Sequence, residues 1–109
     1  MLGIELVKVK EIRLGEDISA CRVKFTISQS TWNSGCGYGR VYKNGVAIGT
    51  QRSYCSTPNA TFSEDFTDFK KEDLIQIYGY KDGSNNYWIE NFCLCYYVIL
   101  FSSSQNTLE

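Results

Sequence analysis

The segment with the most definite structural signature is Gly39-Arg40-Val41-Tyr42-Lys43-Asn44-Gly45-Val46-Ala47-Ile48-Gly49-Thr50. It holds one Asn-Gly pair between residues that favour strands. A type I′ turn needs positive φ at both central residues, and Asn followed by Gly adopts that conformation with little strain. The segment therefore predicts an antiparallel hairpin. The expected pairs are Lys43 with Val46, Tyr42 with Ala47, Val41 with Ile48, and Arg40 with Gly49.

Outside this hairpin the chain alternates between strand-like segments and turn residues, and no segment has the apolar spacing of a helix. Roughly seven or eight short strands are typical of an all-β protein, here an antiparallel β-sandwich that is jelly-roll-like in outline. A length of 109 residues fits one domain. We expect that domain at residues 1–101, with a flexible polar tail at 102–109 whose last two residues match a cloning scar. Besides the hairpin arms, strands are expected at residues 4–13, 20–28, 60–66, 74–80 and 87–101.

The clearest strand covers residues 20–28, in which apolar and polar residues alternate and predict one face on the core and one in water. Its inward residues would be Cys21, Val23, Phe25 and Ile27. The mostly apolar segment 87–101 predicts a central strand buried on both faces, or two strands with a bend. Residues 81–86 resemble a second hairpin loop. The aromatic residues whose position in the strand alternation predicts that they point into the core are Phe25, Phe62, Phe66, Phe92 and Trp88.

The chain has five cysteines, an odd number. Cys36 and Cys55 lie near the two far ends of the hairpin, and a disulfide between them is our first expectation. In the expected register Cys36 faces Ser53, so the bridge needs a bulge, or a bend in the polar loop before Cys36. No metal site is expected, because the chain has no His and no Cys-x-x-Cys spacing. The other thiols are expected to be small buried residues: Cys21, Cys93 and Cys95.

No arrangement typical of catalysis is evident. The absence of His removes the commonest general base, and adjacent acids on a strand point to opposite faces and cannot cooperate. Asp82, Ser84 and Asn86 begin like a calcium loop. However, Tyr87 stands where that loop needs Gly, and Cys93 stands where it needs Glu. We therefore expect a protein that is not an enzyme and that needs no cofactor.

Charge and hydropathy narrow the classes of partner. The net charge is −1, with acidic and basic residues interleaved, so nothing indicates binding to nucleic acid. The most apolar stretch, residues 93–101, is too short to cross a bilayer as a helix, and no membrane insertion is expected.

Surface recognition is the remaining class of function. Tyr and Trp each offer a flat apolar body with a polar group, which stacks on sugar rings or anchors a protein interface. Trp32 lies in a polar loop and is the best single candidate. The other candidate binding residues are Tyr38, Tyr42 and Tyr54. The alternation of their strands does not decide whether these side chains face the core or the solvent. The alternative is that the tyrosines cover the sandwich with their hydroxyls in water.

Several segments together carry a resemblance to a known kind of module. They are residues 39–50, Phe62-Ser63-Glu64-Asp65-Phe66, Asp73-Leu74-Ile75-Gln76-Ile77-Tyr78 and Asn91-Phe92. Over about residues 20–97 the chain resembles a module of phage and prophage tail or fibre-type proteins, similar in outline to the jelly roll of the C1q and TNF families. The resemblance implies a non-catalytic binding or assembly module, often trimeric, and carries over no catalytic residues.

Two functional hypotheses follow. The first is a structural or adhesive module of a virion, tail or cell-surface protein, which assembles with copies of itself. The second is a carbohydrate-binding sandwich. The partner would be another copy of the chain, or a glycan or protein of a host surface, and the location would be a virion or the outside of a cell. Assembly predicts burial of Cys93, Cys95 and Tyr97 between subunits, whereas glycan binding predicts a groove lined by Trp32 and tyrosines.

Overall fold

The structure, a computed structural model, describes residues 6–29, 35–56 and 58–96. These residues form strands and turns, and none of them is helical. Trp32, Tyr97 and the tail 102–109 lie outside the described residues. The strands are β1 (Val7–Arg13), β2 (Ile18–Gln29), β3 (Gly37–Lys43), β4 (Val46–Ala47), β5 (Arg52–Tyr54), β6 (Asn59–Phe69), β7 (Leu74–Lys81) and β8 (Tyr87–Tyr96).

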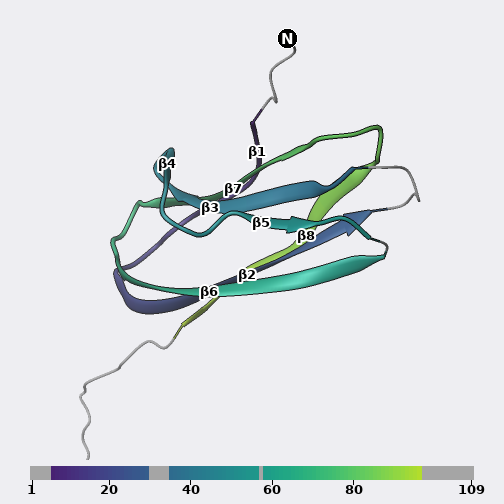
Figure 1. Cartoon of the computed structure of the whole chain (residues 1–109). Helices are drawn as coiled ribbons and strands as arrows, with labels where there is room; N and C mark the ends of the chain where they lie inside the picture. Colours follow the sequence, from purple (N-terminus) through teal and green to yellow (C-terminus); the bar gives the residue numbers. More distant parts are fainter. Residues whose placement is uncertain (1–5, 30–34, 57, 97–109) are drawn as a thin grey trace, which may run out of the picture.

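The strands form two antiparallel sheets that lie one above the other as the layers of a sandwich (Figure 1). The larger sheet has the order β1-β7-β3-β4, and β5 pairs with β3 next to β4. The smaller sheet has the order β6-β2-β8. Apart from the run β3-β4-β5, consecutive strands lie in different sheets. The predicted all-β antiparallel sandwich is confirmed.

The core lies between the two layers. β2 is the central strand of the smaller sheet and turns Val23 and Ile27 inward, both with 0% exposure. Ile75 and Ile77 of β7 enter the core from the larger sheet and are also fully buried. The alternation predicted for residues 20–28 is confirmed on this inner side. The buried apolar residues are Leu14, Ile18, Cys21, Val23, Phe25, Ile27, Val41, Phe69, Ile75, Ile77 and Ile89.

The outer side of β2 differs from the expectation near its end, where Thr26 and Ser28 are buried as well. Their hydroxyls have partners on the two neighbouring strands. Thr26 Oγ1 lies 2.8 Å from the hydroxyl oxygen of Thr61, and Ser28 donates to the Glu90 carboxylate. Because buried hydroxyls are costly only when they lack a hydrogen bond, a central strand tolerates them on both of its faces.

The hairpin forms where the sequence predicts it. Asn44 and Gly45 have φ values of 52° and 84°, and Tyr42 pairs with Ala47 and Lys43 with Val46. The tip is fixed by Asp73, whose Oδ1 accepts from the Asn44 amide at 3.0 Å.

The hairpin register changes just beyond its tip. The N–H groups of Ile48 and Gly49 both donate to the Val41 carbonyl, at 3.0 and 3.1 Å, so the expected pairing of Arg40 with Gly49 is not formed. Two donors on one acceptor are the mark of a β-bulge. After it, Gly39 pairs with Arg52 rather than with Thr50.

This shift places Cys36 opposite Cys55. The two residues form a disulfide, with 4.1 Å between their Cα atoms. The predicted bridge is therefore present, and the irregularity that it needs lies between β4 and β5 within the described residues.

The structure corrects three expectations for β8. It is an edge strand of its sheet, not a central one. Asn91 has a φ of 56°, and the pairing with β2 shifts register there, so the side-chain phase changes along the strand. Ile89 is buried before the irregularity, whereas Trp88, placed in the core by uninterrupted alternation, is 43% exposed. Cys93 and Cys95 share one face, as two residues two apart must, but that face is exposed.

The segment at 82–86 is also different from its prediction. It was expected as a hairpin loop, but β7 and β8 lie in different sheets, so the segment crosses from one layer to the other. Turn residues such as Asp82 and Gly83 are compatible with both kinds of connection. The pairing of β1 with β7 shifts register between Lys8 and Lys10.

Candidate functional site

Four tyrosines gather on the outer face of the larger sheet, on its two central strands. Tyr38 and Tyr42 lie on β3, and Tyr78 and Tyr80 lie on β7. The alternation of a strand explains this placement, because intervening residues such as Val41 and Ile77 are buried in the core. All four tyrosines keep part of their surface in solvent.

The tyrosines form two pairs across the strands. Tyr38 is directly opposite Tyr80, and their rings are stacked with centroids 4.3 Å apart and an interplanar angle of 10°. Tyr42 reaches diagonally to Tyr78, with centroids 4.2 Å apart and an angle of 32°. Cross-strand aromatic pairs of this kind stabilise a sheet and hold each ring in one orientation.

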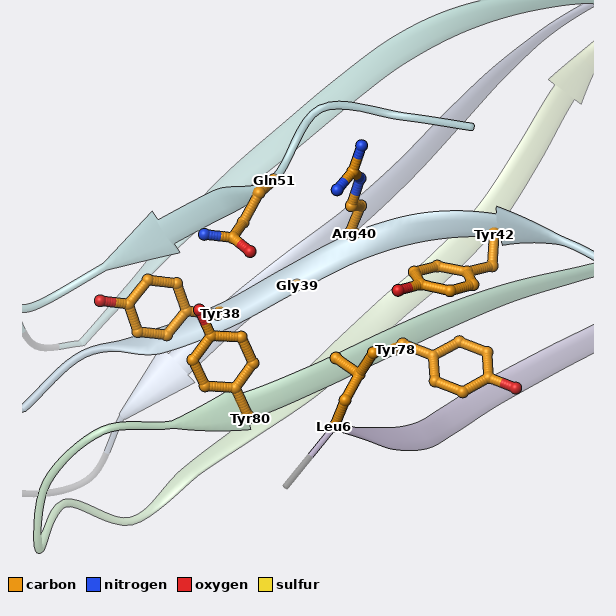
Figure 2. A pocket seen from close by; sticks show the side chains of 8 residues that line it. All are labelled: Leu6, Tyr38, Gly39, Arg40, Tyr42, Gln51, Tyr78 and Tyr80. Carbon is orange, nitrogen blue, oxygen red and sulfur yellow. The ribbon is translucent and has the colours of Figure 1, made fainter. Parts of the chain in front are cut away.

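A shallow pocket of about 260 Å³ lies over these pairs. Figure 2 shows the two pairs toward opposite ends of the pocket, with Arg40 and Gln51 along one side and Leu6 along the other. Leu6 is 45% exposed although it is apolar. The lining residues are Leu6, Tyr38, Gly39, Arg40, Tyr42, Gln51, Tyr78 and Tyr80.

One end of the pocket is fixed by Asp82. Its Oδ2 accepts from the Tyr38 hydroxyl and its Oδ1 accepts from the Cys36 N–H, both at 2.7 Å. The Cys36 N–H, followed by the Tyr38 hydroxyl, holds the pKa of Asp82 below its ordinary value. The hydrogen bond between the Tyr38 hydroxyl and Asp82 also raises the pKa of Tyr38. Because Cys36 is also joined to Cys55, this end of the pocket is anchored to β5.

Glycines on the inner face allow close packing beneath the pocket. A Cβ atom on Gly39 would lie 2.8 Å from the Phe25 ring, and one on Gly79 would lie 2.5 Å from the Tyr38 carbonyl oxygen. Side chains at these positions would therefore force the layers or the two strands apart. The glycines let the Phe25 ring and the half-buried Tyr87 support the strands that carry the tyrosines.

The predicted binding residues fall in different places. Tyr38 and Tyr42 line the pocket together. Tyr54 packs against the core from β5 and does not line it, and Trp32 lies outside the described residues. Sequence reasoning missed Tyr78, Tyr80 and the other lining residues. The spacing of Tyr78 and Tyr80, two apart on one strand, was a signal that they share a face, but the sequence does not show that β7 lies beside β3.

Among residues 6–29, 35–56 and 58–96, no three or more His, Cys, Asp or Glu residues are placed to hold a metal ion. Within those ranges no helix is long and apolar enough to cross a membrane.

Comparison with known proteins returned no matching family model, no similar curated protein and no similar solved structure. The comparisons therefore do not bear on the resemblance to tail-fibre and C1q-type modules, which stays a prediction.

Proposed function

We propose that the protein is a non-catalytic binding module and that the tyrosine-lined pocket binds a carbohydrate. The observation that carries this proposal is the double pair of half-exposed tyrosines over a concave part of a sheet. Aromatic side chains present apolar faces and edges to the C–H groups of a sugar ring, while their hydroxyls serve its hydroxyl groups. Binding sites of small molecules are generally concave, mostly apolar and lined by a few polar groups.

The size of the pocket fits one sugar ring better than a long ligand. Its volume of about 260 Å³ lies just below the range of sites for drug-sized molecules, roughly 300–1,000 Å³. Tyr78 and Tyr80 are two residues apart on one strand, so their Cα atoms are separated by about 7 Å. A sugar ring bound in the pocket would have one tyrosine pair toward each of its ends (Figure 2).

The disulfide supports a place outside the reducing cytosol. Cys36–Cys55 is a structural bridge, and such bridges persist mainly in secreted, periplasmic or surface proteins. This supports the proposal of a virion or extracellular module, in which a carbohydrate would be a natural surface ligand.

The test is calorimetric titration with neutral and acidic oligosaccharides. We expect Tyr80→Ala to weaken binding roughly tenfold, because it removes one ring of the stacked pair. Tyr96→Ala is the matched control, since Tyr96 is 41% exposed on the other sheet and should leave binding unchanged. Equal affinity of the two variants, or no binding of any oligosaccharide, would contradict the proposal.

Self-assembly is the second candidate, favoured by the exposed side chains of β8. Trp88 and Tyr96 are 43% and 41% exposed, and the exposed Cys93 and Cys95 lie on the same strand at the edge of its sheet. Large apolar side chains on an edge strand are a ready surface for a second copy. Light scattering with and without reductant tests this candidate. A dimer or trimer that survives reductant supports it, and a monomer under both conditions rejects it.

A further inference from the structure

We propose that the ligand of the tyrosine-lined pocket is an acidic sugar whose carboxylate binds Arg40. This inference rests on the proposed function and adds the chemical class of the ligand. The observation that carries it is the charge of Arg40, which no carboxylate of the described residues pairs with, inside a pocket with no other charged lining residue.

Arg40 differs from the other arginines of the chain. The chain has Arg13, Arg22, Arg40 and Arg52. Three of them form ion pairs, with Glu72, Asp65 and Glu64 respectively, whereas among the described residues no carboxylate pairs with Arg40.

The guanidinium group of Arg40 is held in place by the backbone. Its Nε donates to the Gly49 carbonyl, an oxygen that the bulge between β4 and β5 brings beside β3. Within the described residues, no hydrogen bond engages its two terminal nitrogens. Those two nitrogens can bind a carboxylate in one of the bidentate geometries open to arginine.

The charge of the pocket favours an anion. Arg40 is the sole charged residue among those that line it, and Gln51 adds a neutral amide. The carboxylate of Asp82, at the Tyr38 end, already accepts hydrogen bonds from Tyr38 and Cys36. The positive charge of this half-buried guanidinium is balanced by no carboxylate of the described residues, so an anionic ligand gains more here than on an open surface.

The aromatic walls restrict the anion to one that is carried on a ring. A free carboxylate or an acidic peptide would satisfy Arg40 but would leave the two tyrosine pairs without a contact. An acidic sugar, such as a uronic or sialic acid, has a carboxylate directly on a ring with apolar C–H faces. Such a ring would contact the tyrosines while its carboxylate reaches Arg40.

The experiment compares probes that differ only in charge. They are trigalacturonate and its neutral methyl ester, and sialyllactose and its neutral methyl ester, each titrated into the full chain. We expect at least one acidic probe to bind about tenfold more tightly than its neutral partner, and this preference to shrink as salt is added.

Two substitutions assign the preference to Arg40. In Arg40→Gln the acidic and neutral partners should bind with equal affinity, because the positive charge that distinguishes them is gone. Arg40→Lys keeps the charge and should retain part of the preference, which provides a second variant if the first fails to fold.

The outcomes separate the two proposals. If neutral probes bind in the pocket and acidic ones bind no better, the inference about Arg40 is overturned and the carbohydrate-binding function stands. If no probe of either kind binds, both proposals are overturned. If the acidic preference persists in Arg40→Gln, another cation recognises the carboxylate and the assignment to Arg40 is wrong.

Discussion

Replacing the disulfide cysteines, as Cys36→Ser with Cys55→Ser, tests how the hairpin and the pocket are held together. The bridge joins the start of β3 to the end of β5, beyond the β-bulge. The Cys36 N–H also binds Asp82, which in turn accepts from Tyr38. Loss of the bridge therefore raises the conformational entropy of the unfolded chain and removes one constraint on the Tyr38 end of the pocket.

The magnitude follows from the loop that the disulfide closes. The two cysteines are 19 residues apart. The chain-entropy relation for a loop of this length gives about 3 kcal/mol of stabilisation at 25 °C. A small domain has about 5–15 kcal/mol in total, so the variant should still fold. At roughly 4–8 °C for each kcal/mol, its thermal midpoint should fall by about 12–24 °C.

Urea unfolding of the wild type and the double variant measures the effect. Wild type with reductant should match the variant, and Cys93→Ser with Cys95→Ser should change the free energy of unfolding by less than about 0.5 kcal/mol, because both thiols are exposed. A loss below about 1 kcal/mol in the disulfide variant would refute the reasoning, since the bridge would then not constrain the unfolded chain.

Three further substitutions test the packing and the hairpin. Gly79→Ala should cost about 1–3 kcal/mol in urea unfolding, because its Cβ would lie 2.5 Å from a backbone oxygen, whereas Gly15→Ala, with nothing within 4 Å, should cost almost nothing. Ile27→Ala should cost about 2–5 kcal/mol, since its side chain is fully buried, and a smaller loss would place it outside the core. The hydrogen bonds from the Lys70 N–H and, second, from the Asn44 amide lower the pKa of Asp73 in the folded protein. The ionised Asp73 therefore stabilises the folded protein above its unfolded-state pKa, and this stabilisation is lost as pH falls through its folded-state pKa. Asp73→Asn should thus differ most from wild type at neutral pH, and the difference should begin to shrink only as pH falls below about 4 toward the lowered folded-state pKa.

Local sequence patterns were sufficient to predict the class of fold and the tip of the hairpin. The Asn44-Gly45 turn and the alternation of residues 20–28 depend on residues close in sequence, and both are present in the structure. The disulfide could be predicted for the same reason, because the hairpin brings its two ends together. The register of the hairpin beyond its tip could not be predicted, since a bulge at Ile48 and Gly49 has no marked signal in the sequence.

The errors in register and side-chain phase share one physical cause, which is that a single irregular residue changes the direction of every side chain beyond it. At Asn91 a positive φ shifts the phase of β8, so Trp88 lies outside the core although Phe92 packs against it. The pocket was missed for a different reason. It needs β7 beside β3, and the order of strands in a sheet is set by long-range packing rather than by residues near Tyr78 and Tyr80.

The most direct test of the pocket is a backbone-amide NMR titration of the full chain with trigalacturonate and its methyl ester. If the pocket is the ligand site, the shifts that change on binding should cluster on β3 and β7, around Tyr38, Tyr42 and Tyr80, with trigalacturonate saturating first. Changes centred on β8, around Trp88 and Tyr96, or no changes with either probe, would contradict the account.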